Sequence, residues 1–242
     1  MKLPKLCLLI VITLFVGCKN KSAKSDKIAK IDSSTISISP DLIGSYVGPF
    51  GKNRITLLIT KVTGDSVAGR TVVGGNDRPF VGTVKKDSGI IKVEAKEPGD
   101  DKNDGMFNLS FDEKNKNILV GDWKPFVENK NSGAKNFTLN RKVFVYSKDV
   151  GIYPQASQRE LKESDVNNLT KWELEVMRNE IFARHGYCFK KKNIRETLET
   201  QDWYVPNTVD VKDMLTDVEK KNVELIKKYE KYSDEYGDEY GR

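Results

Sequence analysis

Cysteine and histidine are scarce in this chain of 242 residues, which holds three cysteines and one histidine. A structural zinc site takes four ligands, mostly from these two residue types, so the sequence argues against one. Neither a Gly-rich phosphate loop nor a Gly-x-Ser-x-Gly string occurs. We therefore predict no metal, no cofactor and no catalytic residue, and a protein that is not an enzyme.

A large excess of charge of one sign is also missing. Lys and Arg number 41 against 35 Asp and Glu, a formal net charge of +6. Nucleic-acid-binding domains usually concentrate basic residues on one face, and the chain has no basic stretch with interleaved aromatics in its folded region. We expect no nucleic-acid partner, and the mild excess suits an acidic surface such as anionic lipid or cell-wall polymer.

The N-terminal apolar run is too short to cross a bilayer as a helix, which takes about twenty residues. It spans residues 6–16 with one threonine among them. Lys2 and Lys5 precede it. A positive start followed by a short apolar run is typical of a secretory signal peptide, which we assign to residues 1–17.

The run ends in Phe15-Val16-Gly17-Cys18. This string resembles a lipobox, in which a small residue precedes the cysteine that is diacylated and becomes the new N-terminus, although Phe15 stands where Leu is usual. The resemblance implies acylation of Cys18, for example with palmitate, and anchoring to the cell membrane outside the cytoplasm. Lys19 follows, which permits outer-membrane delivery if the source is Gram-negative. An ordinary signal peptide cut elsewhere is the alternative.

Residues 18–39 have almost no apolar content and several lysines. Such a segment cannot bury enough surface to offset its chain entropy, so we expect a flexible tether. Beyond it only Cys188 remains, which leaves no intramolecular disulfide. A lone cysteine of this kind is most often a small buried hydrophobe, and a reactive or intermolecular thiol is the alternative.

Residues 40–146 are predicted to form an all-β domain. Apolar residues recur at every second position, as in 55–59, 91–95 and 107–111, and turn signals separate about eight such runs. The short connections make neighbouring strands antiparallel. Glycines recur at inward-facing strand positions, which favours an up-and-down barrel over a sandwich. The architecture is loosely similar to lipocalin and avidin barrels, too loosely to transfer a ligand or a binding residue.

The period changes to that of helices over residues 150–232. Capping boxes begin two helices, one at Thr170 with Glu173 and one at Thr216 with Glu219. Gly186 ends the first helix. The acidic repeat at 233–242 is too short to fold alone, so we expect a disordered tail.

This region resembles the YARHG domain. The resemblance rests on the string from Arg178 to Tyr187, followed by Phe189, by Trp203-Tyr204-x-Pro206 and by the closing helix with Glu219 and Asn222. Phe182 stands where the family name records tyrosine. It implies an extracellular, small all-α domain that often occurs in bacterial lipoproteins and has no established activity. The candidate binding or structural motif is Arg184, His185, Gly186, Tyr187, Trp203 and Tyr204.

His185 has three possible roles. The role we favour is structural, in which His185 completes the helix end as a cation at a helix C-terminus. A binding role is the second. Catalysis with Glu180, Arg184 or Cys188 is the third, and nothing in the spacing brings those side chains together.

Three functions follow for the whole chain. The first is a membrane-anchored, non-catalytic binding or interaction module of the bacterial cell envelope, with a cell-wall polymer or an envelope protein as its partner. The second is an envelope hydrolase acting on cell wall or glycan, whose paired carboxylates could lie far apart in the sequence. The third is a small-ligand carrier that uses the barrel interior.

Overall fold

The computed structural model describes residues 40–99, 104–127 and 133–236. The predicted signal peptide, the tether and Cys18 lie outside the described residues. Within the described ranges no helix is both long and apolar enough to cross a membrane. Nor does any group of three or more His, Cys, Asp or Glu residues in those ranges come together to hold a metal ion.

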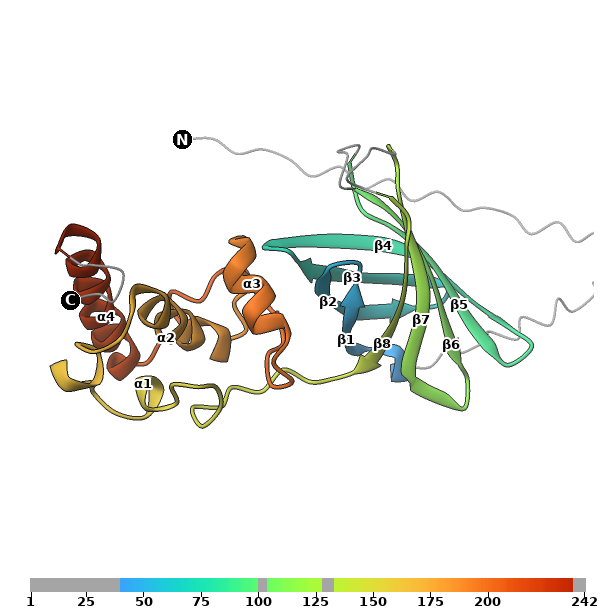
Figure 1. Ribbon diagram of the computed structural model, residues 1–242. Helices are drawn as coiled ribbons and strands as arrows, with labels where there is room; N and C mark the ends of the chain where they lie inside the picture. The colour runs from blue at the N-terminus through green and yellow to red at the C-terminus, as the bar shows by residue number, and fades with distance from the viewer. Residues whose placement is uncertain (1–39, 100–103, 128–132, 237–242) are drawn as a thin grey trace, which may run out of the picture. The chain divides into compact units, whose positions relative to one another are not determined.

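Eight antiparallel strands form a closed barrel, each paired with the next along the chain and the last with the first (Figure 1). The closing pair aligns Tyr46 with Arg141 and Val47 with Asn140. The predicted eight-stranded up-and-down barrel is therefore confirmed. A 3₁₀ turn η1 (Pro40–Leu42) precedes strands β1 (Gly44–Phe50), β2 (Asn53–Thr63), β3 (Ser66–Val73), β4 (Asn76–Asp87), β5 (Ile90–Lys96), β6 (Gly105–Asp112), β7 (Asn115–Pro125) and β8 (Lys135–Arg141).

The barrel interior is filled by alternate residues of each strand. In β5, Ile91, Val93 and Ala95 are buried while the residues between them are exposed. Aromatic rings meet edge to face inside, for example Tyr46 and Phe111 with ring centroids 5.3 Å apart. This burial of one face against water on the other explains the period-two pattern of the sequence.

Two strand glycines allow the close approach of neighbouring backbone. A Cβ at Gly69 would overlap the carbonyl oxygen of Leu58 and the ring of Phe80. A Cβ at Gly82 would overlap the carbonyl oxygen of Glu94. Side chains at these positions would push apart strands that the curvature of the barrel brings together.

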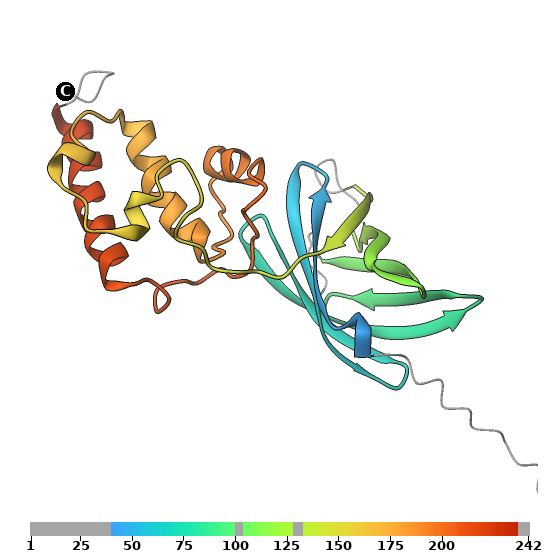
Figure 2. The same cartoon turned by 90° about the horizontal axis from the view of Figure 1, so that it is seen from below.

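The C-terminal region is helical (Figure 2). Its elements are α1 (Gln155–Gln158), the 3₁₀ turn η2 (Glu163–Asp165), α2 (Lys171–Arg184), α3 (Lys192–Glu199) and α4 (Asp217–Tyr236). Both predicted capping boxes are present: Thr170 and Glu173 bond reciprocally at the start of α2, and Thr216 and Glu219 do so at α4. These bonds satisfy amide groups that a helix start leaves without intrahelical partners.

The end of α4 differs from the prediction. The helix runs to Tyr236, so the first residues of the expected 233–242 tail are helical. An ion pair between Lys171 and Asp234 ties this last turn to α2, and the rings of Tyr232 and Tyr236 lie 5.3 Å apart on one face. Residues 237–242 lie outside the described part of the chain.

Two apolar clusters support the helices. One joins α1, α2 and α4 around Leu174, Ile181 and Ile226. The other joins α2, α3 and the following loop around Phe189 and Tyr204. The boundary between an independent β domain and an independent helical domain stays a prediction.

Candidate functional site

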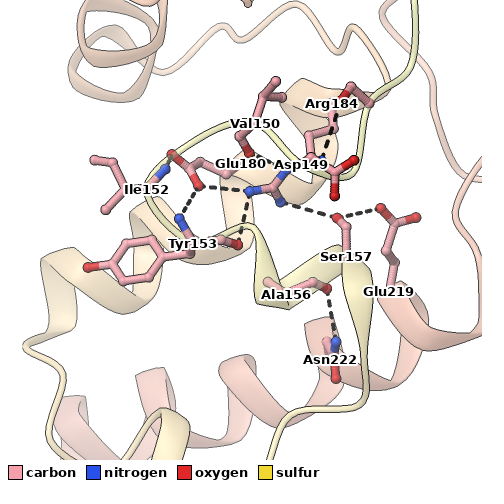
Figure 3. A network of polar contacts seen from close by, with 11 residues as sticks. Asp149, Val150, Ile152, Tyr153, Ala156, Ser157, Glu180, Arg184, Glu219 and Asn222 are labelled. Atoms are coloured by element: carbon pink, nitrogen blue, oxygen red, sulfur yellow. Dashed lines mark hydrogen bonds and ion pairs between the residues drawn. The ribbon is translucent and has the colours of Figure 1, made fainter.

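Arg184, in the last turn of α2, is 1% exposed and lies at the centre of a network of polar contacts (Figure 3). Its guanidinium donates to the carbonyl oxygens of Val150 and Tyr153, at 2.9 Å each. It also donates to Ser157 Oγ at 3.1 Å and to Glu180 Oε2 at 3.0 Å. Burial lowers the pKa of Arg184, and Glu180 opposes that change. The residue thus fixes the segment that precedes α1 to the end of α2.

Glu180 lies one turn before Arg184 and holds the same segment. Its carboxylate accepts from the amides of Ile152 at 2.8 Å and Tyr153 at 2.9 Å. Gly151 has a φ of +96°, and a Cβ there would lie 2.5 Å from Glu180 Oε2. Glycine at 151 therefore allows both the left-handed backbone and the approach of the carboxylate.

His185 follows Arg184 and bonds to α4. Its Nε2 lies 2.7 Å from Glu219 Oε2. Ser157 Oγ at 2.7 Å and Tyr146 Oη at 3.2 Å donate to Glu219 Oε1. Burial raises the pKa of Glu219, but the bonds from His185, Ser157 and the Thr216 amide outweigh it and hold the pKa at about 2. The carboxylate is therefore ionised and fully partnered at neutral pH.

These three side chains do not have the order of a hydrolytic triad. In a triad the histidine lies between the nucleophilic hydroxyl and the carboxylate. Here the carboxylate of Glu219 lies between Ser157 and His185, and Ser157 also accepts from Arg184. Ser157 and His185 are both buried. The arrangement supports a structural role for His185.

The structure brings together the two parts of the candidate motif, residues 184–187 and residues 203–204. Tyr204 Oη donates to the carbonyl oxygen of Tyr187 at 2.7 Å, across seventeen positions of sequence. Phe189 packs on Tyr187, with centroids 4.9 Å apart, and lies 6.3 Å from the Tyr204 ring. Tyr204 is fully buried, whereas Trp203 is only partly buried and packs against it. Tyr204 is thus the ring at the centre of this cluster.

Sequence reasoning gave Ser157 and Tyr146 no role. Neither sits in a motif, and each meets Glu219 from more than sixty positions away. Asn222 did enter the comparison with the family, without a role. In the structure its side-chain oxygen accepts from the Leu161 backbone amide, and its side-chain nitrogen donates to the carbonyl oxygens of Ala156 and Arg159. The sequence signal that could have indicated this network was the presence of polar residues on the buried face of α4.

Cys188 lies where a buried hydrophobe was expected. It is 1% exposed, and the amide of Gly75 donates to its Sγ at 3.1 Å. Burial raises the pKa of the Cys188 thiol to about 11. The thiolate fraction at neutral pH is therefore very small, which disfavours a reactive role.

Comparison with known families matches residues 150–231 to the model of the YARHG domain. Residues 150–231 form a YARHG domain. The match leaves the barrel outside it. No curated protein and no solved structure matches the chain. The polar network around Arg184 and Glu219 therefore belongs to the YARHG domain, except for Tyr146, which precedes it.

The barrel holds a second candidate site, a cavity of about 310 Å³ at the end where β1 turns into β2 and β3 into β4. Ligand pockets in proteins begin at about this size. Aromatic and charged side chains converge on it. The described residues that line it include Phe50, Ile55, Thr71, Val73, Arg78, Glu97, Phe107, Trp123, Lys135 and Arg195.

Glu97 is 4% exposed in this cavity. Its Oε2 accepts from Trp123 Nε1 at 3.1 Å and from the Gly105 amide at 3.0 Å, and its Oε1 from Thr71 Oγ1 at 3.4 Å. Burial raises the pKa of Glu97, opposed by the bond from Trp123 and the charge of Arg78. Sequence reasoning missed it, although it continues the inward-facing positions of β5 one step past Ala95.

Lys135 crosses the same cavity. Its ammonium lies 4.2 Å from the ring centroid of Trp123 and 5.1 Å from that of Phe50. It also donates to the carbonyl oxygen of Gly133 at 3.2 Å. Burial lowers the pKa of Lys135, and Glu97 opposes this. The ring faces partly replace the water that the ammonium has lost.

Arg195 reaches the cavity from α3 of the YARHG domain. Its Nη1 donates to the carbonyl oxygen of Lys190 at 3.0 Å. Its Nε is buried and meets no hydrogen-bond partner among the described residues. The YARHG domain thus contributes a charged donor to a cavity that the barrel otherwise forms.

Proposed function

We propose that this protein is a lipid-anchored, non-catalytic binding protein of the bacterial cell envelope whose barrel binds a small ligand. Export and anchoring rest on the signal peptide over residues 1–17 and the lipobox at Cys18. The observation that carries the binding role is the barrel cavity. Small barrels can hold one small ligand beside the side chains that fill them. The core of this barrel is packed, and a cavity of about 310 Å³ remains at the end where β1 turns into β2.

The cavity has the composition of a binding site. Ligand pockets are lined by apolar and aromatic side chains with a few polar groups that fix orientation. Phe50, Phe107 and Trp123 supply the rings, and Glu97 and Lys135 supply polar groups that are already desolvated. Since these groups have shed part of their hydration on folding, less must be lost when a ligand enters.

A neutral fluorophore, N-phenyl-1-naphthylamine, tests whether the cavity takes ligands. Val73→Phe should fill the cavity and abolish energy transfer from Trp123 to the probe. Val81→Phe is the matched control, because Val81 is 54% exposed on the barrel surface. Equal binding by both variants would place the probe elsewhere and remove the basis of the proposal.

Anchoring has a separate test. Cys18→Ala should abolish labelling of the protein by palmitate and release it from membranes. Continued labelling of this variant would contradict the assignment of the lipobox.

The hydrolase remains the alternative function. Glycan hydrolysis commonly uses two carboxyl groups that flank the scissile bond. Glu97 is the one carboxylate among the described residues that line the cavity. Turnover of wall glycan that Glu97→Gln removes, while the protein stays folded, would favour the hydrolase over the binding protein.

A groove on the YARHG domain supports an acidic cell-wall polymer as the envelope partner. It measures about 540 Å³, and its lining includes Phe182, Tyr187, Lys190 and Lys212. Rings stack on sugar faces, and the lysines complement an acidic polymer. Purified cell walls should bind wild type in a salt-sensitive manner. Lys190→Glu with Lys212→Glu should weaken that binding, and unchanged binding would point to an envelope protein instead.

A further inference from the structure

We infer that the ligand of the barrel cavity is a small anionic amphiphile, with an apolar or aromatic body and one acidic group such as a carboxylate or sulfonate. This inference rests on the proposed function. It names the ligand class for the cavity, and it follows from which lining groups are already satisfied and which are not.

The negative charge of the cavity is already matched. Glu97 accepts hydrogen bonds from Trp123, Gly105 and Thr71. An incoming ligand cation would have to displace those donors. It would also approach the ammonium of Lys135, which lies over Trp123. Like-charge repulsion in a partly desolvated site disfavours a cationic ligand.

The positive groups are matched less completely. Arg78 pairs with Asp104 at 2.7 Å, so its charge already has a carboxylate partner. The ammonium of Lys135 donates one hydrogen bond among the described residues, to the Gly133 carbonyl, and its other contacts are two ring faces rather than a carboxylate. Arg195 keeps a buried Nε–H without a partner among the described residues. Glu199, one turn along α3, interacts electrostatically with Arg195, but its own buried Oε1 also has no hydrogen-bond partner among the described residues. An acidic group in the cavity would supply acceptors for both Lys135 and Arg195.

The apolar half of the ligand follows from the rings. Trp123 donates its only N–H to Glu97, so beside its contacts with Lys135 and Phe50 it can offer a ligand only its ring. Phe107 and Ile55 are buried residues of the core that reach the cavity wall. Aromatic rings prefer offset or edge contacts with other rings, which the edge-to-face pair of Phe50 and Trp123 already displays.

Two probes that differ by one acidic group test the inference. N-phenyl-1-naphthylamine is neutral, and 8-anilinonaphthalene-1-sulfonate carries the same rings with a sulfonate. Trp172→Phe with Trp203→Phe leaves Trp123 as the only tryptophan, because the chain has three. Energy transfer from Trp123 then reports occupancy of the cavity in the full chain carrying Cys18→Ala. We expect the anionic probe to bind at least tenfold more tightly.

Variants that remove or keep the positive charge at residue 135 test why the anionic probe is preferred. Lys135→Met should weaken the anionic probe about tenfold and leave the neutral probe unchanged, and Lys135→Arg should restore the preference. Lys124→Met, at an exposed position of β7, is the matched control. Equal affinity of wild type for both probes, or a preference that survives Lys135→Met with Arg195→Gln, would overturn the ligand class while the binding role stands. Failure of both probes to bind would instead overturn the proposed function.

Discussion

His185 Nε2 and Glu219 Oε2 lie 2.7 Å apart and join the end of α2 to the first turn of α4. The same carboxylate closes the capping box of α4 and accepts from Ser157. The side chain of Glu219 therefore caps the start of α4 and bonds to both the end of α2 and the short helix α1. The energetic cost of removing it should exceed that of any exposed carboxylate on the same helix.

Glu219→Gln should destabilise the folded protein by about 3 kcal/mol, because it leaves a buried network without its charge. Glu224→Gln, exposed on α4, is the control and should change little. The sign with pH follows from the pKa of about 2 in the folded state, below the ordinary 4.5. The stabilisation is present above pH 4.5 and is lost as the pH falls toward 2. Urea unfolding of both variants at several pH values measures this, and equal stabilities at pH 6 would contradict it.

Glu199 should show the opposite dependence on pH. Burial raises its pKa to about 7, opposed by Arg54 and Arg195. The folded state then binds a proton that the unfolded state has released, so stability falls as the pH rises from 4.5 to 7. Glu199→Gln should remove this decline and be up to about 3 kcal/mol more stable than wild type at pH 8. Glu196→Gln, exposed on the same helix, is the control. Parallel pH profiles of wild type and Glu199→Gln would refute the assignment.

Tyr204 rather than Trp203 should dominate the stability of its cluster. Tyr204→Ala removes a fully buried ring and should cost about 3–5 kcal/mol. Tyr204→Phe loses the bond to the Tyr187 carbonyl and should cost about 1 kcal/mol. Trp203→Ala should cost about 2 kcal/mol, because the ring is partly exposed before the change. Thermal and urea unfolding rank the three, and a larger loss for Trp203→Ala would reverse the assignment.

The barrel and the helix starts could be predicted because their signals are local. Strand period, turn residues and the Thr170–Glu173 spacing each lie within a few residues of one another. The Ser157–Glu219 contact and the Glu97 cavity could not, since each depends on which distant elements meet. In the sequence Glu97 cannot be distinguished from an exposed surface glutamate, because its burial depends on the closed barrel. Likewise Trp203 and Tyr204 are equivalent in the sequence, and only packing against Phe189 separates them.

The isolated YARHG domain should be more stable when the fragment begins before residue 150. Tyr146 stacks on His185, with ring centroids 4.6 Å apart, and donates to Glu219. Phe144 lies against Gly186, whose φ of +77° ends α2. A fragment starting at 150 loses both rings.

We expect residues 143–236 to be helical by circular dichroism, to melt cooperatively, and to exceed residues 150–236 in stability by about 1–2 kcal/mol. Tyr146→Ala in the longer fragment should lower its stability by most of that difference, whereas Val143→Ala, at an exposed position, should not. Equal melting of the two fragments would show that Tyr146 adds nothing. Disorder of both, beside a folded full chain, would mean that the barrel is needed, through contacts such as Arg54 with the carbonyls of Gln201 and Tyr204, and that the two regions form one cooperative unit.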